Sequence, residues 1–232
     1  MSNSIKQRQD EYRHRYLDGS LCGLPTGKAI CVGRNYLDHI KELNSPLPEQ
    51  SMFFMKPSTA LCGFEKSITI PQKKGECHNE LELTFLVKNK LTCANVSEVE
   101  MAIAGIGLSL DLTLRDEQSR LKQLSHPWER AKAFDGSCPT SKFVSWQTCC
   151  DDEYFVFELL INGQSVQQGD SRMMLKPAFE LIAEMSHWFT LVPGDIVLTG
   201  TPKGVRALHA GDRLNISLQN YFIEESRVLE YE

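Results

Sequence analysis

The sequence predicts a mostly β protein of the α+β class, built as one domain. Its 232 residues are enough for a single sizeable core. Short apolar runs of strand length recur along the chain, and glycine or proline turns separate them. Asn162-Gly163 stands between two such runs and predicts a tight hairpin turn. Only a few segments show the apolar spacing of a helix, so strands are expected to form the framework.

The first half of the chain alternates predicted strands with short helices. An apolar run that ends in a glycine turn predicts the first strand, and prolines mark the ends of the next two. Ser97 can cap a short helix, with Glu100 three residues later as its capping-box partner. In chain order we expect a strand at 28–33, a helix at 37–43, strands at 52–57, 67–71 and 80–88, a helix at 97–101, an apolar run at 102–110 and a polar helix at 113–124.

The second half is predicted to hold one long helix among strands. Apolar residues recur at helical spacing between Asp170 and Phe189, and Pro177 is expected to set or bend the start of that helix. Turns that contain Gly-Asp separate the strands that follow. The expected strands are at 143–144, 155–161, 164–166, 196–198, 214–218 and 222–229.

Charge and composition exclude several classes of function. The formal net charge is -5 and charges of both signs are interspersed, so no basic stripe for nucleic acid is present. No membrane segment is visible, and the polar stretch 1–23 lacks the apolar run of a secretory signal, so a cytoplasmic protein is expected. The eight cysteines have no regular spacing, which predicts reduced thiols in packing roles. The glycine motifs of nucleotide-binding loops and of the serine-hydrolase elbow are missing from the sequence.

Glu80 and Glu82 are the first candidate functional residues. They stand at the start of a predicted buried strand, where residues i and i+2 share a face. Like charges on a half-buried face repel, and an unpaired carboxylate in an apolar interior is costly, so a divalent cation is a natural partner. For a Glu-x-Glu pair taken alone, a solvated face with lysine partners is the better interpretation.

The position of Asp111 favours a bound cation. It follows the apolar run 102–110 directly, so a third carboxylate is expected in an equally apolar setting. Three carboxylates, with water completing an octahedron, suit Mg²⁺ or Mn²⁺. Cys77 and His78 adjoin the glutamates, but their spacing matches no zinc motif.

Further motifs extend over nearly the whole chain, from Ile30 to about Leu218. They are Cys31-Val32-Gly33-Arg34-Asn35-Tyr36 followed by His39 and Glu42, Phe54-Met55-Lys56-Pro57, His78-Asn79-Glu80-Leu81-Glu82, Asp111-Leu112-Thr113-Leu114-Arg115-Asp116, Ala131-Lys132-Ala133-Phe134-Asp135, and Leu198-Thr199-Gly200-Thr201-Pro202-Lys203-Gly204-Val205. With these motifs the chain resembles the fumarylacetoacetate hydrolase superfamily. It looks most like the short single-domain branch, which contains acylpyruvate hydrolases, oxaloacetate decarboxylases and oxaloacetate tautomerases.

The resemblance implies an architecture and a metal site. The implied fold is a mixed β-roll or sandwich with a few peripheral helices, formed by residues 26–232 as one catalytic domain after an N-terminal extension at 1–25. A homodimer is usual in the family. The resemblance assigns Mg²⁺ or Mn²⁺ to Glu80, Glu82 and Asp111, where the charge argument had already placed a cation. Asn79 departs from the pattern, because many short-branch members carry a second histidine there.

The resemblance also implies catalytic and substrate-binding residues. His39 and Glu42 lie one helical turn apart, so the carboxylate can orient the imidazole, and the family uses this pair to activate water. In the family Lys132 lies beside the metal, where its ammonium can neutralise charge on a substrate oxygen; the structural alternative is a lysine paired with Asp135. The implied substrate contacts are Arg34, Arg115, Gln118, Asp135 and Thr201.

The implied chemistry is that of a small 2-oxo acid and its enolate. Hydrolysis of a C–C bond in an acylpyruvate is the first expectation, with His39 and Glu42 activating the water. Oxaloacetate keto–enol tautomerisation, oxaloacetate decarboxylation and 2-hydroxyhepta-2,4-diene-1,7-dioate isomerisation are the alternatives, because one site can serve all of these reactions. A metal-binding homologue without activity is the non-enzyme alternative.

Overall fold

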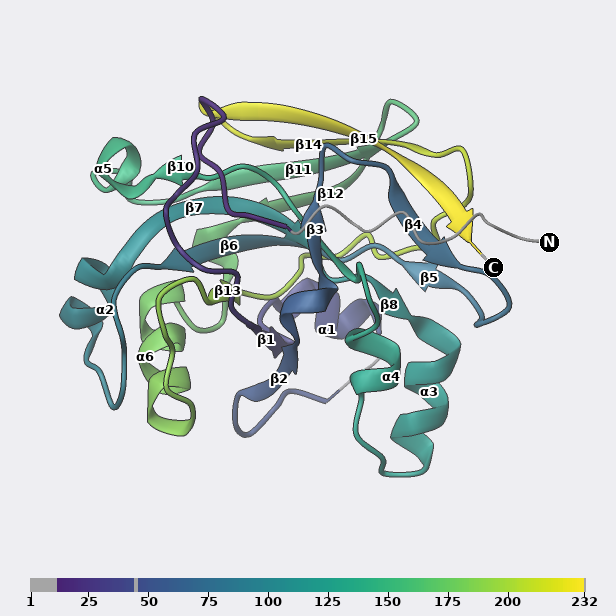
Figure 1. The fold of residues 1–232 in the computed structure, drawn as a ribbon. Helices are drawn as coiled ribbons and strands as arrows, with labels where there is room; N and C mark the ends of the chain where they lie inside the picture. The colour runs from purple at the N-terminus through teal and green to yellow at the C-terminus, as the bar shows by residue number, and fades with distance from the viewer. Residues whose placement is uncertain (1–11, 44–45, 232) are drawn as a thin grey trace.

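The structure is a computed structural model that describes residues 12–43 and 46–231. Two β-sheets form its framework, the smaller lying across the larger, and the helices lie around them (Figure 1). The prediction of a mostly β, α+β fold is confirmed. Residues 1–11 of the expected extension, and Glu232, lie outside the described residues.

The larger sheet has eight strands and supplies the framework of the candidate site. Its central strands β6 and β7 are antiparallel neighbours and are buried along their whole length, as their continuous apolar sequences require. The order across the sheet is β2 (Met52–Lys56), β1 (Ala29–Gly33), β13 (Ile196–Leu198), β6 (Leu81–Val87), β7 (Ile103–Leu110), β9 (Cys138–Thr140) and β3 (Leu61–Gly63), with β10 (Val144–Ser145) also paired to β7.

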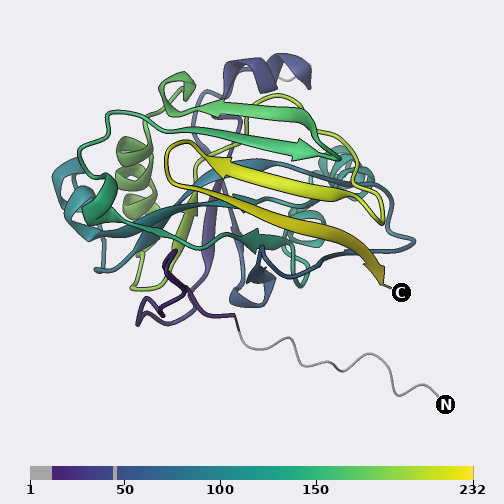
Figure 2. The same cartoon turned by 90° about the horizontal axis from the view of Figure 1, so that it is seen from above.

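The smaller sheet has five strands and covers one face of the larger sheet (Figure 2). Buried and half-buried residues alternate along its strand β11, as expected for a sheet with one face on the core. The order is β12 (Gln164–Asp170), β11 (Val156–Ile161), β14 (Arg213–Leu218), β15 (Phe222–Tyr231) and β4 (Ile68–Pro71). A two-stranded ribbon joins β5 (Cys77–His78) to β8 (Thr113–Leu114).

The main hydrophobic core lies between the two sheets. Leu83 and Leu108 of the larger sheet belong to the same buried cluster as Leu159 and Ile216 of the smaller sheet. The predicted hairpin turn joins β11 to β12, with Asn162 and Gly163 both at positive φ, which matches a type I′ turn. Residues of β6 and β7 belong to this core, and the ends of these two strands carry the candidate carboxylates.

The helices lie outside the sheets. Helices α2 and α6 pack together at one end of the molecule, while α3 and α4 lie at the other (Figure 1). Their bounds are α1 (Leu37–Glu42), α2 (Val96–Ala102), α3 (Arg115–Gln123), α4 (Glu129–Lys132), α5 (Trp146–Cys149) and α6 (Ala178–Trp188), with 3₁₀ turns at Ser58–Ala60 and Ser171–Met173. Within the described residues, no helix is both long and apolar enough to cross a bilayer.

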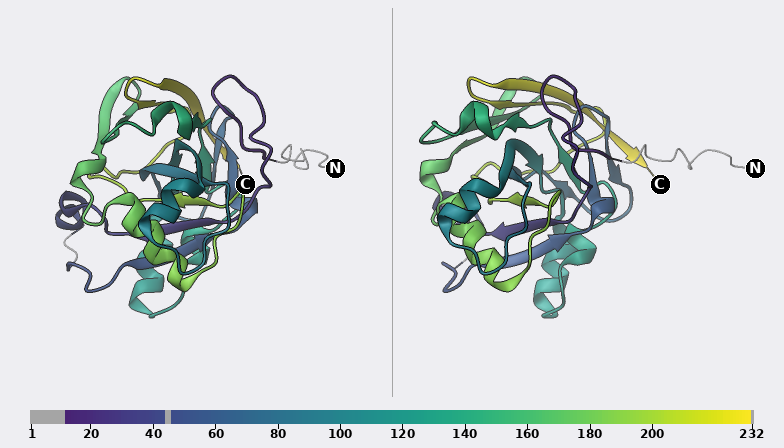
Figure 3. Two further views of the ribbon diagram at one scale, coloured as in Figure 1. Left: turned by 90° about the vertical axis from the view of Figure 1, so that its left-hand side faces the viewer. Right: turned by 60° about the vertical axis from the view of Figure 1, so that its left-hand side comes forward.

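The chain from Tyr12 to β1 runs over the outside of the larger sheet (Figure 3). Tyr12 and Tyr16 pack against a second buried cluster on that face. His14 is buried, and its Nε2–H donates to the carbonyl of Gly194 at 2.9 Å. Burial lowers the pKa of His14 to about 4, although the bond to Gly194 opposes this shift. The boundary drawn at residue 25 stays a prediction.

Two local predictions were wrong. Helix α2 is capped by Asn95, whose side chain accepts from the backbone N–H of Glu98, so the capping box lies two residues before the predicted one. Helix α6 begins at Ala178 rather than at Asp170, and the expectation that Pro177 sets its start is confirmed. Pro177 has extended ψ, and a proline disfavours helical geometry in the residue before it, so the helix cannot extend backwards through this position.

Candidate active site

Glu80, Glu82 and Asp111 meet at one end of the larger sheet. Glu80 precedes β6, Glu82 is its second residue, and Asp111 follows β7. The antiparallel pairing brings these strand ends together, and the backbone N–H of Asp111 donates to the carbonyl of Glu80 at 2.8 Å. One carboxylate oxygen from each of the three residues lies within 4.8 Å of the other two, and all three side chains are buried. The spacing rule that put both glutamates on one face is therefore correct.

The three carboxylates have unequal electrostatic surroundings. Burial alone would raise the pKa of Glu80, but Lys132 and Arg115 outweigh it and hold that pKa well below its usual range. Burial, followed by the charges of Asp111 and Glu80, raises the pKa of Glu82 well above its usual range. Glu82 accepts a hydrogen bond from the backbone N–H of Gly200 at 2.6 Å. No cationic side chain of the described residues forms an ion pair with Glu82.

The chemistry of these donors fits a hard divalent cation. All three offer carboxylate oxygen, which Mg²⁺ and Mn²⁺ prefer, and no histidine or cysteine belongs to the cluster among the described residues. Glu82 also has no ion-pair partner among the described residues, and a divalent ion would supply the positive charge that favours its ionised form. Glu80, Glu82 and Asp111 are thus the residues that could hold a metal.

Two buried lysines flank the carboxylates. Lys132, the last residue of α4, places its Nζ 2.7 Å from Glu80 and 2.5 Å from Asp111. Burial lowers the pKa of Lys132, but the two carboxylates outweigh burial and raise it, so this side chain stays an ammonium. Lys56 at the end of β2 is completely buried, lies 2.8 Å from Asp111 and donates to the carbonyls of Lys132 and Ser137. The sequence placed Lys56 in a motif without assigning it a role.

His39 and Glu42 lie on one face of α1, as their spacing predicted. The His39 Nδ1 lies 3.2 Å from the Glu42 Oε2, and His39 is buried against the carboxylate pocket. Glu42 is fixed in turn, because its Oε1 accepts from the backbone N–H of Gly204 at 2.9 Å. With Nδ1 bonded to the carboxylate, Nε2 is the ring atom left for proton transfer.

The predicted substrate contacts separate into two groups. Arg115 donates to Glu80 at 2.6 Å and to Gln118 at 2.7 Å, and both Arg115 and Gln118 line the pocket. Thr201 also lines it, and its hydroxyl donates to the carbonyl of Leu81. Arg34 is a further lining residue. Asp135 is exposed and does not line the pocket, and Lys132 pairs with Glu80 and Asp111 in place of this neighbour.

Gln167 organises the site from the smaller sheet, and no sequence pattern marks it as a site residue. Its side chain in β12 is buried and accepts from Asn79 and from the backbone N–H of Leu81. Its amide donates to the Thr201 hydroxyl at 2.8 Å and to the carbonyl of Pro202. Asn79 therefore belongs to a network that fixes the Gly-Thr-Pro turn.

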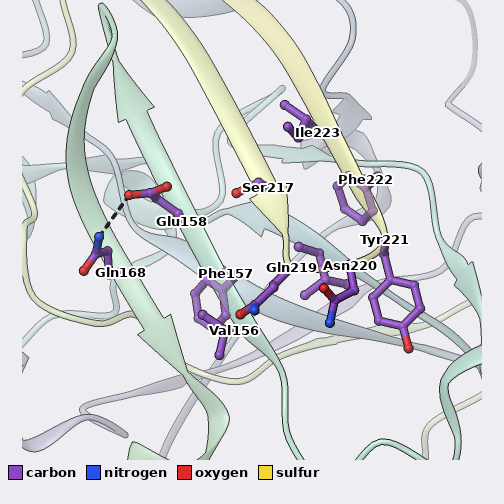
Figure 4. Close-up of a pocket in the computed structure, with 11 residues that line it drawn as sticks. Val156, Phe157, Glu158, Gln168, Ser217, Gln219, Asn220, Tyr221, Phe222 and Ile223 are labelled. Atoms are coloured by element: carbon purple, nitrogen blue, oxygen red, sulfur yellow. Dashed lines mark hydrogen bonds between the residues drawn. The ribbon is translucent and has the colours of Figure 1, made fainter.

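A second hollow lies away from the carboxylates, where β14 turns into β15 (Figure 4). Its volume is about 670 Å³, and Phe157, Tyr221 and Phe222 form much of its wall. Glu158 is the sole charged side chain among the residues that line it, and this carboxylate accepts from Gln168 at 3.0 Å. The hollow contains no cluster of groups that could exchange protons or hold a cation, so the carboxylate pocket is the candidate active site.

Comparison with known proteins identifies the family. Residues 28–228 match the family described as fumarylacetoacetate (FAA) hydrolase C-terminal. The oxaloacetate tautomerase YcgM of Escherichia coli (strain K12) is 44% identical over 219 residues, which cover 94% of this chain and 100% of that protein. The mitochondrial oxaloacetate tautomerase FAHD1 of Bos taurus is 37% identical, covering 82% of this chain and 86% of its own length.

A solved structure extends the comparison. The fumarylpyruvate hydrolase of Pseudomonas aeruginosa, in complex with Mn²⁺ and pyruvate, superposes with a TM-score of 0.88 at 28% identity and covers 99% of this chain and 100% of its own. The family match, the identity to both relatives and this superposition agree with the motifs that surround the carboxylates. The chain therefore belongs to the fumarylacetoacetate hydrolase family.

Proposed function

We propose that this protein is a divalent-metal-dependent oxaloacetate keto–enol tautomerase. The observation that carries the proposal is the 44% identity to the oxaloacetate tautomerase of Escherichia coli across the whole of that protein. Acylpyruvate hydrolysis is the first expectation from the sequence, and tautomerisation is among its alternatives. The higher identity of the tautomerases, compared with 28% for the fumarylpyruvate hydrolase, favours the alternative.

Glu80, Glu82 and Asp111 would hold Mg²⁺ or Mn²⁺. When bound, such an ion supplies Lewis acidity toward the carboxylate and keto oxygens of a 2-oxo acid. Lys132 contributes a fixed positive charge beside the carboxylates, because Glu80 and Asp111 keep its Nζ protonated. Arg115 and Gln118 offer donors for the substrate carboxylate from the first turn of α3, where a guanidinium can bind both oxygens.

His39 is the proposed base. In the keto form of oxaloacetate, Nε2 of His39 takes a proton from C3, and the electron pair of that C–H bond becomes the C2–C3 double bond. The carbonyl π pair moves onto the C2 oxygen, and transfer of the proton to that oxygen completes the enol. Glu42 holds Nδ1–H at 3.2 Å, which favours the imidazolium that forms during the transfer. Ketonisation follows the same path in reverse.

Acylpyruvate hydrolysis is the second candidate. It is supported by the superposition on a hydrolase bound to Mn²⁺ and pyruvate. The same His39–Glu42 pair could then activate water for attack on the distal carbonyl. The two candidates differ in outcome, since hydrolysis breaks a C–C bond and tautomerisation breaks none.

Proton NMR separates these candidates. The protein with Mg²⁺ is offered oxaloacetate in D₂O in one tube and acetylpyruvate in another, each with a chelator control. The proposal expects chelator-sensitive exchange of the C3 protons of oxaloacetate, faster than the uncatalysed exchange, while acetylpyruvate survives. Chelator-sensitive release of acetate and pyruvate, without accelerated exchange in the first tube, would assign hydrolysis instead.

Two further proposals concern the whole protein. We propose a homodimer, as the family resemblance implies, and light scattering during gel filtration measures its mass. A cytoplasmic location is proposed from the sequence composition, and fractionation of the source cells tests it. A mass of about one chain of 26.3 kDa would contradict the dimer.

A further inference from the structure

The mouth of the active-site pocket carries positive charge without a carboxylate partner. Arg34, Arg115, Lys122 and Lys132 all line this pocket. The carboxylates of Glu80 and Asp111 pair with Lys132, and Glu80 also pairs with Arg115. Among the described residues, neither Arg34 nor Lys122 forms an ion pair; Arg34 donates to the carbonyl of Pro46 at 3.4 Å. Two cations therefore remain available to an incoming anion.

Phe54 and Trp128 form an aromatic wall of the pocket that connects Lys132 to Lys122. The Lys132 Nζ lies 5.1 Å from the ring centre of Phe54, and that ring lies 6.2 Å from the ring of Trp128. The Lys122 Nζ lies 5.3 Å from the Trp128 ring centre, within the range of a cation–π contact. Lys132 is buried and Lys122 is exposed, so the wall runs from the carboxylates to the mouth.

The surroundings of Lys122 disfavour its charge in the free protein. Partial burial is the largest cause that lowers the pKa of Lys122, and the nearby charges of Arg115, Arg34 and Lys132 act in the same direction; Glu80 opposes them, and the result is a pKa of about 8. Like charges that face one pocket repel, and an anion between them would remove that repulsion. The free protein therefore keeps an unfavourable cluster that a ligand could stabilise.

The backbone of Arg34 is strained. Its φ of 65° lies in the left-handed region, which costs an L-residue with a side chain about 1–2 kcal/mol. The residue lies between the end of β1 and the start of α1, and its side chain lines the pocket. Strain of this kind persists where the surrounding structure demands one conformation, and such positions cluster at ligand sites.

We propose that Lys122 and Arg34 form a second anion subsite, which binds the carboxylate of the substrate that lies farther from Glu80, Glu82 and Asp111. The subsite makes the enzyme select 2-oxo dicarboxylates over 2-oxo monocarboxylates. This inference rests on the proposed function for its substrate class and adds Lys122 as a specificity-determining residue. Trp128 positions Lys122 through the face of its ring.

Two unreactive ligands test the subsite without turnover. N-oxalylglycine is an analogue of a 2-oxo dicarboxylate in which an amide carbonyl stands for the keto group, with N–H in place of an enolisable C–H. In N-ethyloxamate a methyl group replaces the distal carboxylate. Calorimetry of the Mn²⁺-loaded protein measures both affinities. We expect N-oxalylglycine to bind about tenfold more tightly, the size of one charge-assisted contact at a partly exposed site. Lys122→Gln should bring the ratio of the two affinities close to one. Lys122→Arg should retain most of the preference for N-oxalylglycine.

Arg120→Gln is the matched control. Arg120 lies on the same helix, pairs with Glu117 and does not line the pocket, so the affinity ratio should stay at its original value. A ratio near one in the unaltered protein, or an unchanged ratio in Lys122→Gln, would overturn the subsite. If the affinities behave as expected while oxaloacetate is not tautomerised, the proposed function fails and the subsite stands.

Discussion

The Nζ of Lys56 lies 2.8 Å from Oδ1 of Asp111, and both side chains are withdrawn from solvent. Lys56 comes from the edge strand β2 and Asp111 from the end of β7, so this pair ties the edge of the larger sheet to the candidate metal site. A buried charge that loses its partner is expensive, whereas an intact buried pair is close to neutral. The pair therefore positions Asp111 more than it stabilises the fold.

Lys56→Met is expected to destabilise the metal-free protein strongly. The substitution keeps a long apolar side chain but leaves one oxygen of Asp111 buried without its cation, which costs about 3–5 kcal/mol. Urea unfolding followed by circular dichroism measures the change. Lys176→Met removes a partly exposed pair with Glu184 and should cost less than about 1 kcal/mol. Equal losses in the two variants would show that burial of the Lys56 pair has no special effect.

Glu82→Gln is expected to stabilise the metal-free protein and to abolish Mn²⁺ binding. The charge of Glu82 is disfavoured by burial, Asp111 and Glu80, and the amide oxygen can still accept from Gly200. We expect a melting temperature a few degrees higher in chelator, since about 1 kcal/mol shifts a chain of this size by about 2–4 °C. Mn²⁺ should no longer raise the melting temperature of the variant.

Glu80→Gln is the matched comparison, and it should shift the melting temperature of the metal-free protein in the opposite direction. Glu80 pairs with Lys132 and Arg115, which hold its pKa low, so its neutral substitute loses favourable contacts and the metal-free protein should melt at a lower temperature. Mn²⁺ binding should be lost in this variant too. Shifts of the same sign in the two glutamine variants would contradict the assigned electrostatics.

His39→Gln is expected to lower kcat for oxaloacetate by about 10²–10⁴-fold, the usual contribution of a positioned acid–base group. The affinity for Mn²⁺ should change little, because His39 is not part of the carboxylate cluster. Glu42→Gln should lower kcat less, since the imidazole stays and loses its ionised partner. Steady-state kinetics and calorimetry of Mn²⁺ binding check both variants. His209→Gln is the control, because the His209 side chain is highly exposed. An unchanged kcat in His39→Gln would show that His39 takes no part in the mechanism.

The affinity for a dicarboxylate is expected to fall as the pH rises through about 8. The Lys122 ammonium is charged below that pKa and neutral above it, so its attraction for an anion is present at low pH and lost at high pH. Arg115, Arg34, Lys132 and Glu80 face the same group; the pKa of Lys132 is raised and that of Glu80 is lowered, so neither titrates in this range. The ratio of the affinity for N-oxalylglycine to the affinity for N-ethyloxamate, measured between about pH 7 and about pH 9.5, checks this prediction. A flat ratio would exclude Lys122 as the titrating group.

Much of the fold could be predicted because local sequence decides it. The strands that became β6 and β11 show clear apolar patterns, and the Asn162-Gly163 turn has the residues that positive φ requires. The helix boundaries were less predictable. Asn95 and Ser97 are both good caps, and the choice between them depends on which backbone N–H groups tertiary packing leaves free.

The candidate site was partly visible in the sequence. The spacing of Glu80 and Glu82, and the apolar run before Asp111, follow from strand geometry and the cost of buried charge. Lys56 and Gln167 were not assigned roles, because a lysine or glutamine is mostly exposed and only the assembled sheets bury these two. Asp135 is the opposite case, since it is close to Lys132 in sequence but does not line the pocket.

The ketonisation rate of freshly dissolved enol-oxaloacetate, followed through its ultraviolet absorbance, tests whether this protein is a metal-dependent tautomerase. We expect the protein with Mn²⁺ to accelerate the decay of the enol, excess chelator to abolish the acceleration, and Glu82→Gln to lack it while remaining folded. Decay at the uncatalysed rate with Mn²⁺ present, or full acceleration by Glu82→Gln, would rule out a metal-dependent tautomerase.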